Sequence, residues 1–176
     1  MTDQAAIETR VAGFTDYFKR VHFDVMFGMP VCNNMLEVEA VGFRDFNGDV
    51  VGIFITPWFL KVFLLPEEPE MWSDQEVGSK VTWTFPAGEF QCLTDFDEGI
   101  GSYISHSLYS PMAQFKTQDE AREAAEAAIK ALMTEPSEEE KEIMAMDPKS
   151  GSGRRRLFGG MAGAPTSDSP NPDKMT

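Results

Sequence analysis

The passage that most constrains the fold is VVGIFITPWFLKVFLLP, residues 50–66, because apolar side chains fill both its odd and its even positions. A strand with one solvated face alternates apolar and polar residues. If this passage is extended, it therefore has two apolar faces, and each face needs a cover. A membrane-spanning helix is disfavoured, since the run is only about 17 residues long and contains Pro57 and Lys61.

Short alternating segments around this run predict a meander of antiparallel strands. LEVEAVGF at 36–43 alternates, and NGD at 47–49 is a strong hairpin-turn signal that makes the apolar run its return strand. Pro57 lacks a backbone donor, so it should mark a bend that divides the run into two strands. The later predicted strands, separated by turns, are KVTWTF, FQCLTDF and SYISHSLYS, at 80–85, 90–96 and 102–110.

Two helices flank the strands. Residues 3–22 place apolar side chains at helical spacing, with Thr2 or Asp3 as a plausible cap. The segment 117–133 opens with the capping-box pattern Thr117 to Glu120 and carries a face of small apolar residues that suits close packing on a sheet. GMPVCNN at 28–34 is predicted to be a loop.

The predicted fold class is α+β: a curved antiparallel sheet of five or six strands with an N-terminal and a C-terminal helix. Residues 1–133 are expected to form this single domain, and 134–176 to form a flexible acidic, Gly-, Pro- and Ser-rich tail with a basic-aromatic motif at 153–160. Two helices are not expected to cover both faces of such a sheet. Three covers stay open for the second face: curling of the sheet, another protein or a second copy of the chain.

The charge narrows the class of partner. The formal net charge is −14, and residues 1–133 hold 21 acidic against 9 basic side chains. Such a domain is not expected to bind nucleic acid, whereas a basic partner is compatible with it. The acidic, polar N-terminal MTDQAAIETR is not expected to act as a secretory signal. We therefore expect a cytoplasmic protein with reduced thiols and without a membrane span.

The sequence offers little catalytic chemistry, so we predict a binding protein and not an enzyme. His106 stands between Ser105 and Ser107, but neighbours on a strand point to opposite faces, which disfavours a Ser–His pair. The candidate metal ligands are scattered over separate elements, and neither a metal nor a cofactor is predicted; these candidates are Cys32, Cys92, His22 and His106.

Several motifs in order resemble the HybE/HupJ/HoxT family: PVCNN before LEVEAVGF, then GIFITPWFLKVFLLP, FPAGEF, IGSYISHSLYSPM and a late RRRLF. The resemblance implies an accessory protein for the assembly of nickel–iron uptake hydrogenases. Members are described as chaperones of the hydrogenase small subunit before export by the twin-arginine route. Some are linked to rubredoxin-like domains or partners that protect iron–sulfur cluster insertion from oxygen.

The family pattern falls on positions of this chain that we carry over as candidates: Cys32, Thr56, Pro57, Trp58, Ser105, Ser107, Ser110 and Pro111. Relatives often have cysteine where this chain has His106, so a role of that thiol cannot be transferred. The rubredoxin cysteines are also absent, which assigns any electron-transfer role to a separate protein.

The resulting hypothesis is a chaperone that binds its client through an exposed apolar sheet surface. The predicted client-binding residues are Thr56, Pro57, Trp58, Phe59, Trp72, Ser105, Ser107, Ser110 and Pro111. Cys32 is a loop thiol of possible role. The partners implied are the small-subunit precursor, its twin-arginine signal as a further hypothesis, and a rubredoxin-like protein or second chaperone. The predicted tail-docking residues are Arg154, Arg155, Arg156 and Phe158.

Two alternatives stay open. One is a small thiol-active or ligand-binding protein that uses Cys32 and His106. The other is a structural homodimer that buries the open apolar face against a second copy.

Overall fold

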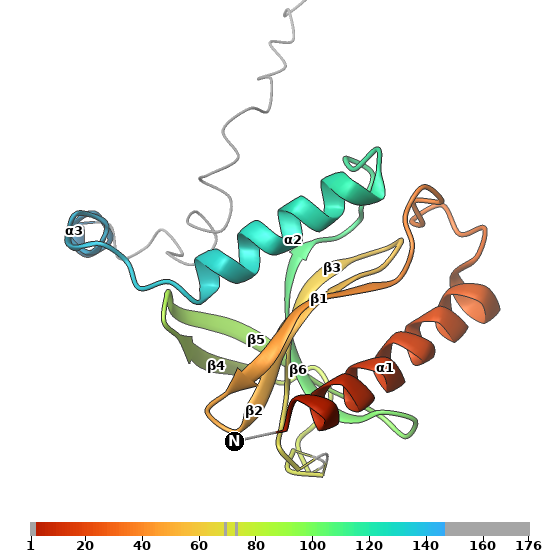
Figure 1. The fold of residues 1–176 in the computed structure, drawn as a ribbon, viewed down its shortest axis with the longest axis horizontal. Helices are drawn as coiled ribbons and strands as arrows, with labels where there is room; N and C mark the ends of the chain where they lie inside the picture. The colour runs from red at the N-terminus through yellow and green to blue at the C-terminus, as the bar shows by residue number, and fades with distance from the viewer. Residues whose placement is uncertain (1–2, 69, 73, 147–176) are drawn as a thin grey trace, which may run out of the picture.

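The computed structural model describes residues 3–68, 70–72 and 74–146, which form an α+β fold around one antiparallel sheet (Figure 1). Its six strands lie in the order β1-β2-β3-β6-β5-β4, so the predicted fold class is confirmed. The elements are α1 Gln4–Val21, the π-helix η1 His22–Met26, β1 Glu39–Phe46, β2 Asp49–Ile55, β3 Leu60–Leu65, β4 Lys80–Phe85, β5 Gly88–Asp97, β6 Gly101–Tyr109, α2 Gln118–Leu132 and α3 Glu138–Met146.

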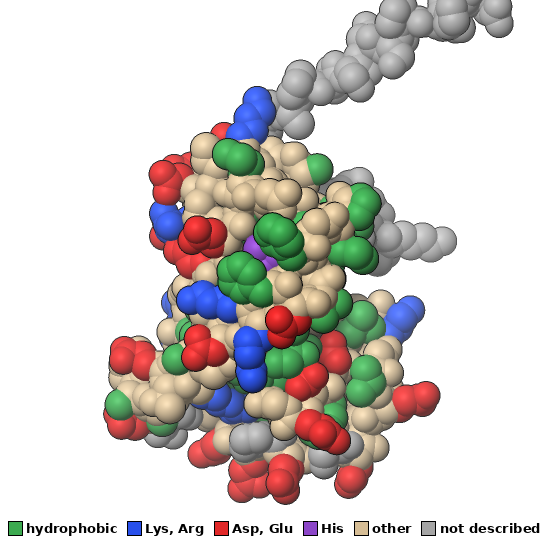
Figure 2. Space-filling view, turned by 90° about the vertical axis from the view of Figure 1, so that its right-hand side faces the viewer, with side chains coloured by type: hydrophobic (Ala, Val, Ile, Leu, Met, Phe, Trp, Pro, Cys, Tyr) green, Lys and Arg blue, Asp and Glu red, His purple; other side chains and the backbone are tan. Residues whose placement is uncertain are grey.

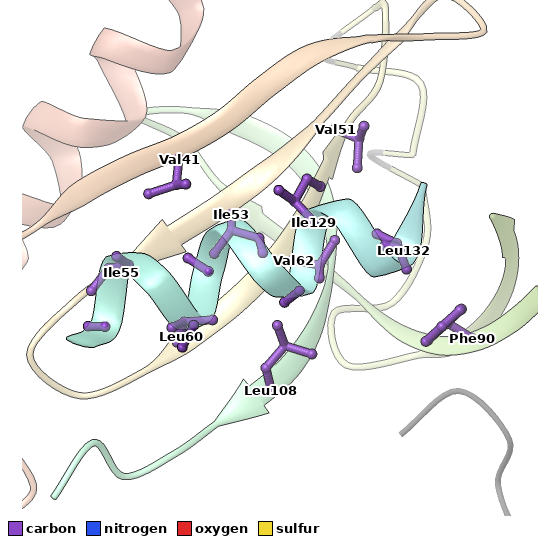
Figure 3. Close-up of a cluster of buried hydrophobic side chains, with 14 of the residues drawn as sticks. Val41, Val51, Ile53, Ile55, Leu60, Val62, Phe90, Leu108, Ile129 and Leu132 are labelled. Atoms are coloured by element: carbon purple, nitrogen blue, oxygen red, sulfur yellow. The ribbon is translucent and has the colours of Figure 1, made fainter. Parts of the chain in front are cut away.

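The two apolar faces of residues 50–65 are covered by two different helices. Alternate residues of β2 point to opposite sides: Val51, Ile53 and Ile55 pack in a core beneath α2, which Figure 3 shows in close-up. Val50 and Phe54 pack in a second core beneath α1. Figure 1 shows α1 and α2 on either side of β1–β3.

The expectation that two helices cannot cover both faces was therefore wrong for β2 and β3, the strands that are apolar on both sides. A helix about 10 Å wide spans roughly two strand spacings of about 4.8 Å, and the run that is apolar on both faces occupies only β2 and β3. Towards the other edge the sheet needs less cover, because β4 and β5 expose polar residues such as Thr82 and Gln91 on one face. No apolar sheet surface is left open over β2 and β3.

Local signals explain where the elements begin and end. Asn47 and Gly48 adopt positive φ values of 56° and 96° in the turn between β1 and β2, which confirms the predicted hairpin. Pro57 divides the apolar run into β2 and β3, also as predicted. Thr117 accepts a hydrogen bond from the Glu120 N–H at 3.2 Å, which confirms the capping box of α2. The first strand begins later than predicted, at Glu39.

Part of the predicted tail has regular structure. Within residues 134–176, the chain forms α3 over Glu138–Met146. This helix begins with its own reciprocal cap, because the Glu140 N–H donates to Ser137 Oγ at 3.3 Å and the Ser137 N–H donates to Glu140 Oε2 at 2.8 Å. None of the helices among the described residues has the length and apolar character needed to span a membrane.

Candidate functional site

The main exposed apolar surface is the chain between α1 and β1. Six of the twelve exposed large hydrophobic side chains among the described residues fall within 23–35, and we call these six the apolar segment: Phe23, Val25, Phe27, Met29, Val31 and Met35. Phe23 is 70% exposed and Phe27 is 68% exposed. Figure 2 faces this side of the molecule and shows hydrophobic side chains gathered on it. Sequence reasoning missed this surface.

The apolar segment lies in the π-helix and loop that follow α1, outside both cores. Its members stand at odd positions, and the even positions between them carry mainly polar or loop-forming residues such as Asp24, Gly28 and Asn34. The first of these residues lie in η1, a π-helical end to α1. Neither of the two cores includes a residue of the apolar segment. The chain therefore displays these side chains instead of packing them.

Asn33 ties the apolar segment to the rest of the fold. Its backbone N–H donates to the Pro57 carbonyl at 2.8 Å. Its side-chain amide donates to the carbonyls of Met112 at 3.0 Å and Phe115 at 2.7 Å. One residue thereby joins the segment to the β2–β3 turn and to the chain between β6 and α2. Asn33 was not among the predicted site residues, although the PVCNN motif contains it.

His22 and Trp58 form the base of the apolar segment. The His22 ring lies 6.0 Å from the Trp58 ring and 5.3 Å from the Phe23 ring, measured between centroids. His22 Nε2 is buried without a hydrogen-bond partner among the described residues. Trp58 is half-buried and packs on the core beneath α1. The rings of Phe23, His22 and Trp58 therefore connect the apolar segment to the β2–β3 turn.

Thr56 and Phe59, both predicted to bind the client, are buried within this turn. Thr56 is 0% exposed, and its hydroxyl accepts hydrogen bonds from the N–H groups of Phe59 at 3.0 Å and Trp58 at 3.3 Å. Phe59 is 7% exposed and packs beneath α1. Pro57 is buried as well. These residues hold the turn together, and only Trp58 among them shows part of its side chain at the surface.

The predicted serines divide between two environments. Ser105 is 6% exposed and pairs with Phe63, whereas Ser107 is exposed. His106 pairs with Val62, whose side chain lies on the α2 side, so the histidine points away from both serines as predicted. Ser110 is exposed at the end of β6, where its hydroxyl donates to the Trp58 carbonyl at 3.4 Å, and the exposed Pro111 follows it.

Trp72 belongs to another part of the molecule. Its ring lies 5.7 Å from the Trp83 ring, and both pack half-buried on the core beneath α2. Trp58 and Phe59 pack on the core beneath α1. The expected single surface around Trp58, Phe59 and Trp72 is therefore not formed, because these residues lie on opposite faces of the sheet.

The two thiols have environments that disfavour nucleophilic chemistry. Cys32 is half-buried with its Sγ 3.0 Å from the Met26 carbonyl oxygen, and burial raises the pKa of its thiol. Burial also raises the pKa of the Cys92 thiol, to about 11. A raised pKa leaves less of the reactive thiolate at neutral pH. In the part of the chain that the structure describes, no three His, Cys, Asp or Glu side chains gather as metal ligands.

The tail-docking candidates Arg154, Arg155, Arg156 and Phe158 lie outside the described residues. The candidate site that the structure supplies thus consists of the apolar segment together with Asn33 and Trp58, which connect it to the rest of the fold. Of the predicted residues, this site brings together Cys32, Pro57, Trp58 and Ser110. It leaves Ser105, Ser107 and Trp72 elsewhere.

Comparison with known proteins identifies the family. The model described as "[NiFe]-hydrogenase assembly, chaperone, HybE" matches residues 9–160. The chain belongs to this family. The matched range runs from α1 through α2 and α3 and includes the basic-aromatic motif at 153–160. The resemblance stated from the sequence is thereby confirmed, and the chain is a member of a family of hydrogenase assembly chaperones.

Individual HybE-family relatives agree. The chain is 38% identical over 141 residues to "Hydrogenase expression/formation protein HupJ" of Bradyrhizobium diazoefficiens, covering 80% of this chain and 81% of the relative. It is 32% identical over 129 residues to "Probable rubredoxin HupJ" of Rhodobacter capsulatus, covering 73% of this chain but only 46% of that protein. The solution structure of HybE from Escherichia coli shares the fold, with a TM-score of 0.58 and 22% identity over 72% of this chain and 78% of that one.

Proposed function

We propose that this HybE-family chain is a cytoplasmic chaperone of the unfinished small subunit of a nickel–iron uptake hydrogenase. It holds the small subunit during iron–sulfur cluster insertion, shields the site of insertion from oxygen and delays export until assembly is complete. It acts by binding and not by catalysis. The observation that carries the proposal is the apolar segment, whose aromatic side chains are displayed to solvent.

The composition of the apolar segment supports this role. Contiguous exposed apolar patches mark interaction sites on proteins. Methionine side chains are flexible and polarizable, so they adapt to partners of varied shape, and the segment combines Met29 and Met35 with Phe23 and Phe27. An unfinished subunit or an apolar export signal offers the matching hydrophobic surface. The net charge of −14 keeps such a protein soluble and favours a client with a basic end.

A rubredoxin-like protein is the second partner we propose. The relative named "Probable rubredoxin HupJ" is matched by this chain over only 46% of its length. The rubredoxin cysteines are absent from this chain, which has only Cys32 and Cys92. A separate protein would therefore supply electron transfer, while this chain holds the client.

The test is capture of the small-subunit precursor by purified full-length chain. Phe23 and Phe27 are exposed, so the double variant F23S/F27S should keep its thermal stability. Burying one aromatic at an interface contributes about 2 kcal/mol or more, which corresponds to about 30-fold in affinity. We expect F23S/F27S to bind the precursor at least about 30-fold more weakly.

Phe96→Ser is the matched control, because Phe96 is 41% exposed on β5, away from the apolar segment. This control should bind like the unchanged chain. Equal binding by F23S/F27S and the unchanged chain would refute the role of the segment. Light scattering on the same samples separates the homodimer alternative: a dimer that F23S/F27S converts to monomer would mean that the segment binds a second copy instead of a client.

A further inference from the structure

A pocket of about 420 Å³ opens beside the first turns of α2, on the surface near the end of β6. Two carboxylates, Glu120 and Glu123, line it together with the aromatic side chains of Tyr109 and Phe115. The two aromatic rings meet edge to face, with centroids 5.0 Å apart and an interplanar angle of 82°. The pocket therefore combines acidic groups with an aromatic wall.

The helix explains the shape of this pocket. Glu120 and Glu123 stand three residues apart, so they share one side of α2. The small side chains of Ala124 and Ala127 leave the space between that side and the aromatic wall. Glu120 is positioned by the capping box, because its Oε2 accepts a hydrogen bond from the Lys116 N–H at 2.7 Å. Its carboxylate is thus held at the pocket by the start of the helix.

The nearby Arg122 forms its ion pairs with residues other than Glu120 and Glu123. Its Nε lies 2.6 Å from Glu39 Oε1, and its Nη1 lies 2.6 Å from Asp119 Oδ1. The first ion pair joins the guanidinium to β1, and the second joins it to the first turn of α2. Neither Glu120 nor Glu123 forms an ion pair with a described residue. The charge of the pocket is left for a ligand.

We propose that this pocket binds an arginine side chain of the partner. A guanidinium is planar, stacks on aromatic rings and donates two parallel hydrogen bonds to a carboxylate. The two carboxylates of the pocket can accept such hydrogen bonds, and the half-buried Tyr109 ring offers a surface for stacking beside the largely buried Phe115. Lysine, a compact and strongly hydrated point charge, would use the carboxylates but gain less from the ring faces.

The pocket is linked to the apolar segment through Phe115 and Asn33. Phe115 lines the pocket with its side chain, and its carbonyl accepts the hydrogen bond from Asn33 that tethers the apolar segment. A partner segment with arginine beside a run of apolar residues could therefore occupy both. This inference rests on the proposed function, which it deepens by assigning the basic end of the client to Glu120 and Glu123.

The test uses the full chain and synthetic peptides that carry two arginines followed by Leu-Phe-Leu. Matched peptides replace the arginines with lysine or with citrulline, which keeps the shape of arginine but loses its charge. We expect the citrulline peptide to bind at least about tenfold more weakly than the arginine peptide, with lysine between them. Chemical shifts of the Tyr109 and Phe115 rings should move on addition of the arginine peptide.

Variants locate the effect. E120Q/E123Q keeps the capping-box geometry, because glutamine also serves at that position, and it should abolish the preference for arginine over citrulline. Ala127→Leu should weaken binding by filling the pocket. Glu126→Gln removes one negative charge from a position of α2 outside the pocket lining and should bind like the unchanged chain. Equal affinity for the arginine and citrulline peptides, or equal losses in E126Q and E120Q/E123Q, would overturn the proposal.

The outcomes separate this inference from the proposed function. If E120Q/E123Q captures the precursor and the arginine peptide normally while F23S/F27S does not, the pocket assignment fails and the client role of the apolar segment stands. If only E120Q/E123Q loses binding of the arginine peptide and F23S/F27S captures the precursor normally, the pocket assignment stands and the client role of the apolar segment fails. A gain in peptide affinity in R154Q/R155Q/R156Q would overturn the assignment to a partner and make the chain's own arginines the occupant.

Discussion

Thr56→Val tests whether the Thr-Pro-Trp motif serves folding or client contact. The Thr56 hydroxyl is fully buried and accepts hydrogen bonds from the N–H groups of Phe59 and Trp58, while donating to the Phe59 carbonyl at 3.1 Å. Valine has nearly the same shape but no hydroxyl. The Phe59 N–H would then be buried without an acceptor, at a cost of about 1–3 kcal/mol.

We therefore expect Thr56→Val to lower the free energy of unfolding by about 2 kcal/mol. For a domain of this size, the melting temperature should fall by about 4–8 °C. Thr56→Ser keeps the hydroxyl and removes one buried methyl group, so it should cost only about 0.8 kcal/mol. Urea unfolding followed by circular dichroism gives both values, and the predicted order of stability is threonine, serine, valine.

Client capture by the folded fraction decides between the two roles. If Thr56 only holds the turn, folded Thr56→Val should bind the precursor with nearly unchanged affinity. Wild-type stability in Thr56→Val would refute the hydrogen-bond reasoning. Unchanged stability together with lost capture would show instead that Thr56 contacts the client.

Two further predictions concern packing and pH. A Cβ added to Gly52 would lie 2.3 Å from Phe43 Cγ, so Gly52→Ala should destabilise the chain by about 1–3 kcal/mol. On α1, a Cβ added to Gly13 meets nothing within 4 Å, so Gly13→Ala should stabilise the chain by about 0.5–1 kcal/mol. Thermal unfolding checks the pair, because the melting temperature should fall in Gly52→Ala and rise in Gly13→Ala. Burial raises the pKa of Glu39, but hydrogen bonds from Arg122 and Gln118 and the Arg122 charge outweigh it and hold that pKa below 4.5. The ionised Glu39 carboxylate therefore stabilises the fold above pH 4.5, and this stabilisation is lost as the pH falls through the lowered pKa. In urea titrations, the difference in unfolding free energy between the unchanged chain and Glu39→Gln should narrow below pH 4.5. A difference that stays constant with pH would contradict this reasoning.

The fold was largely predictable because its signals are local. The Asn47–Gly48 turn, the break at Pro57 and the Thr117 capping box each depend on a few neighbouring residues, and all three appear as expected. The arrangement of the helices was not predictable in this way. Whether α1 and α2 share a face of the sheet or take opposite faces depends on contacts between elements far apart in the sequence.

The exposed apolar surface differs from the one expected around residues 50–66 for a related reason. The most apolar stretch of the chain drew attention to residues 50–66, yet its hydrophobicity reflects burial on both faces. Along residues 23–31 apolar residues alternate with polar and loop-forming ones, but the same alternation is typical of a half-buried strand, so the pattern alone did not identify an exposed surface. Asn33 could not be singled out, since its partners Met112 and Phe115 are remote in the sequence.

The central claim is that the client binds the apolar segment, and amide hydrogen exchange tests it most directly. The full chain would be measured alone and with the small-subunit precursor, and exchange would be followed peptide by peptide. The account predicts slower exchange within residues 22–35 and at the start of α2, with β4 and the first half of β5 unchanged. Slower exchange confined to β4 and β5, with residues 22–35 unaffected, would contradict it.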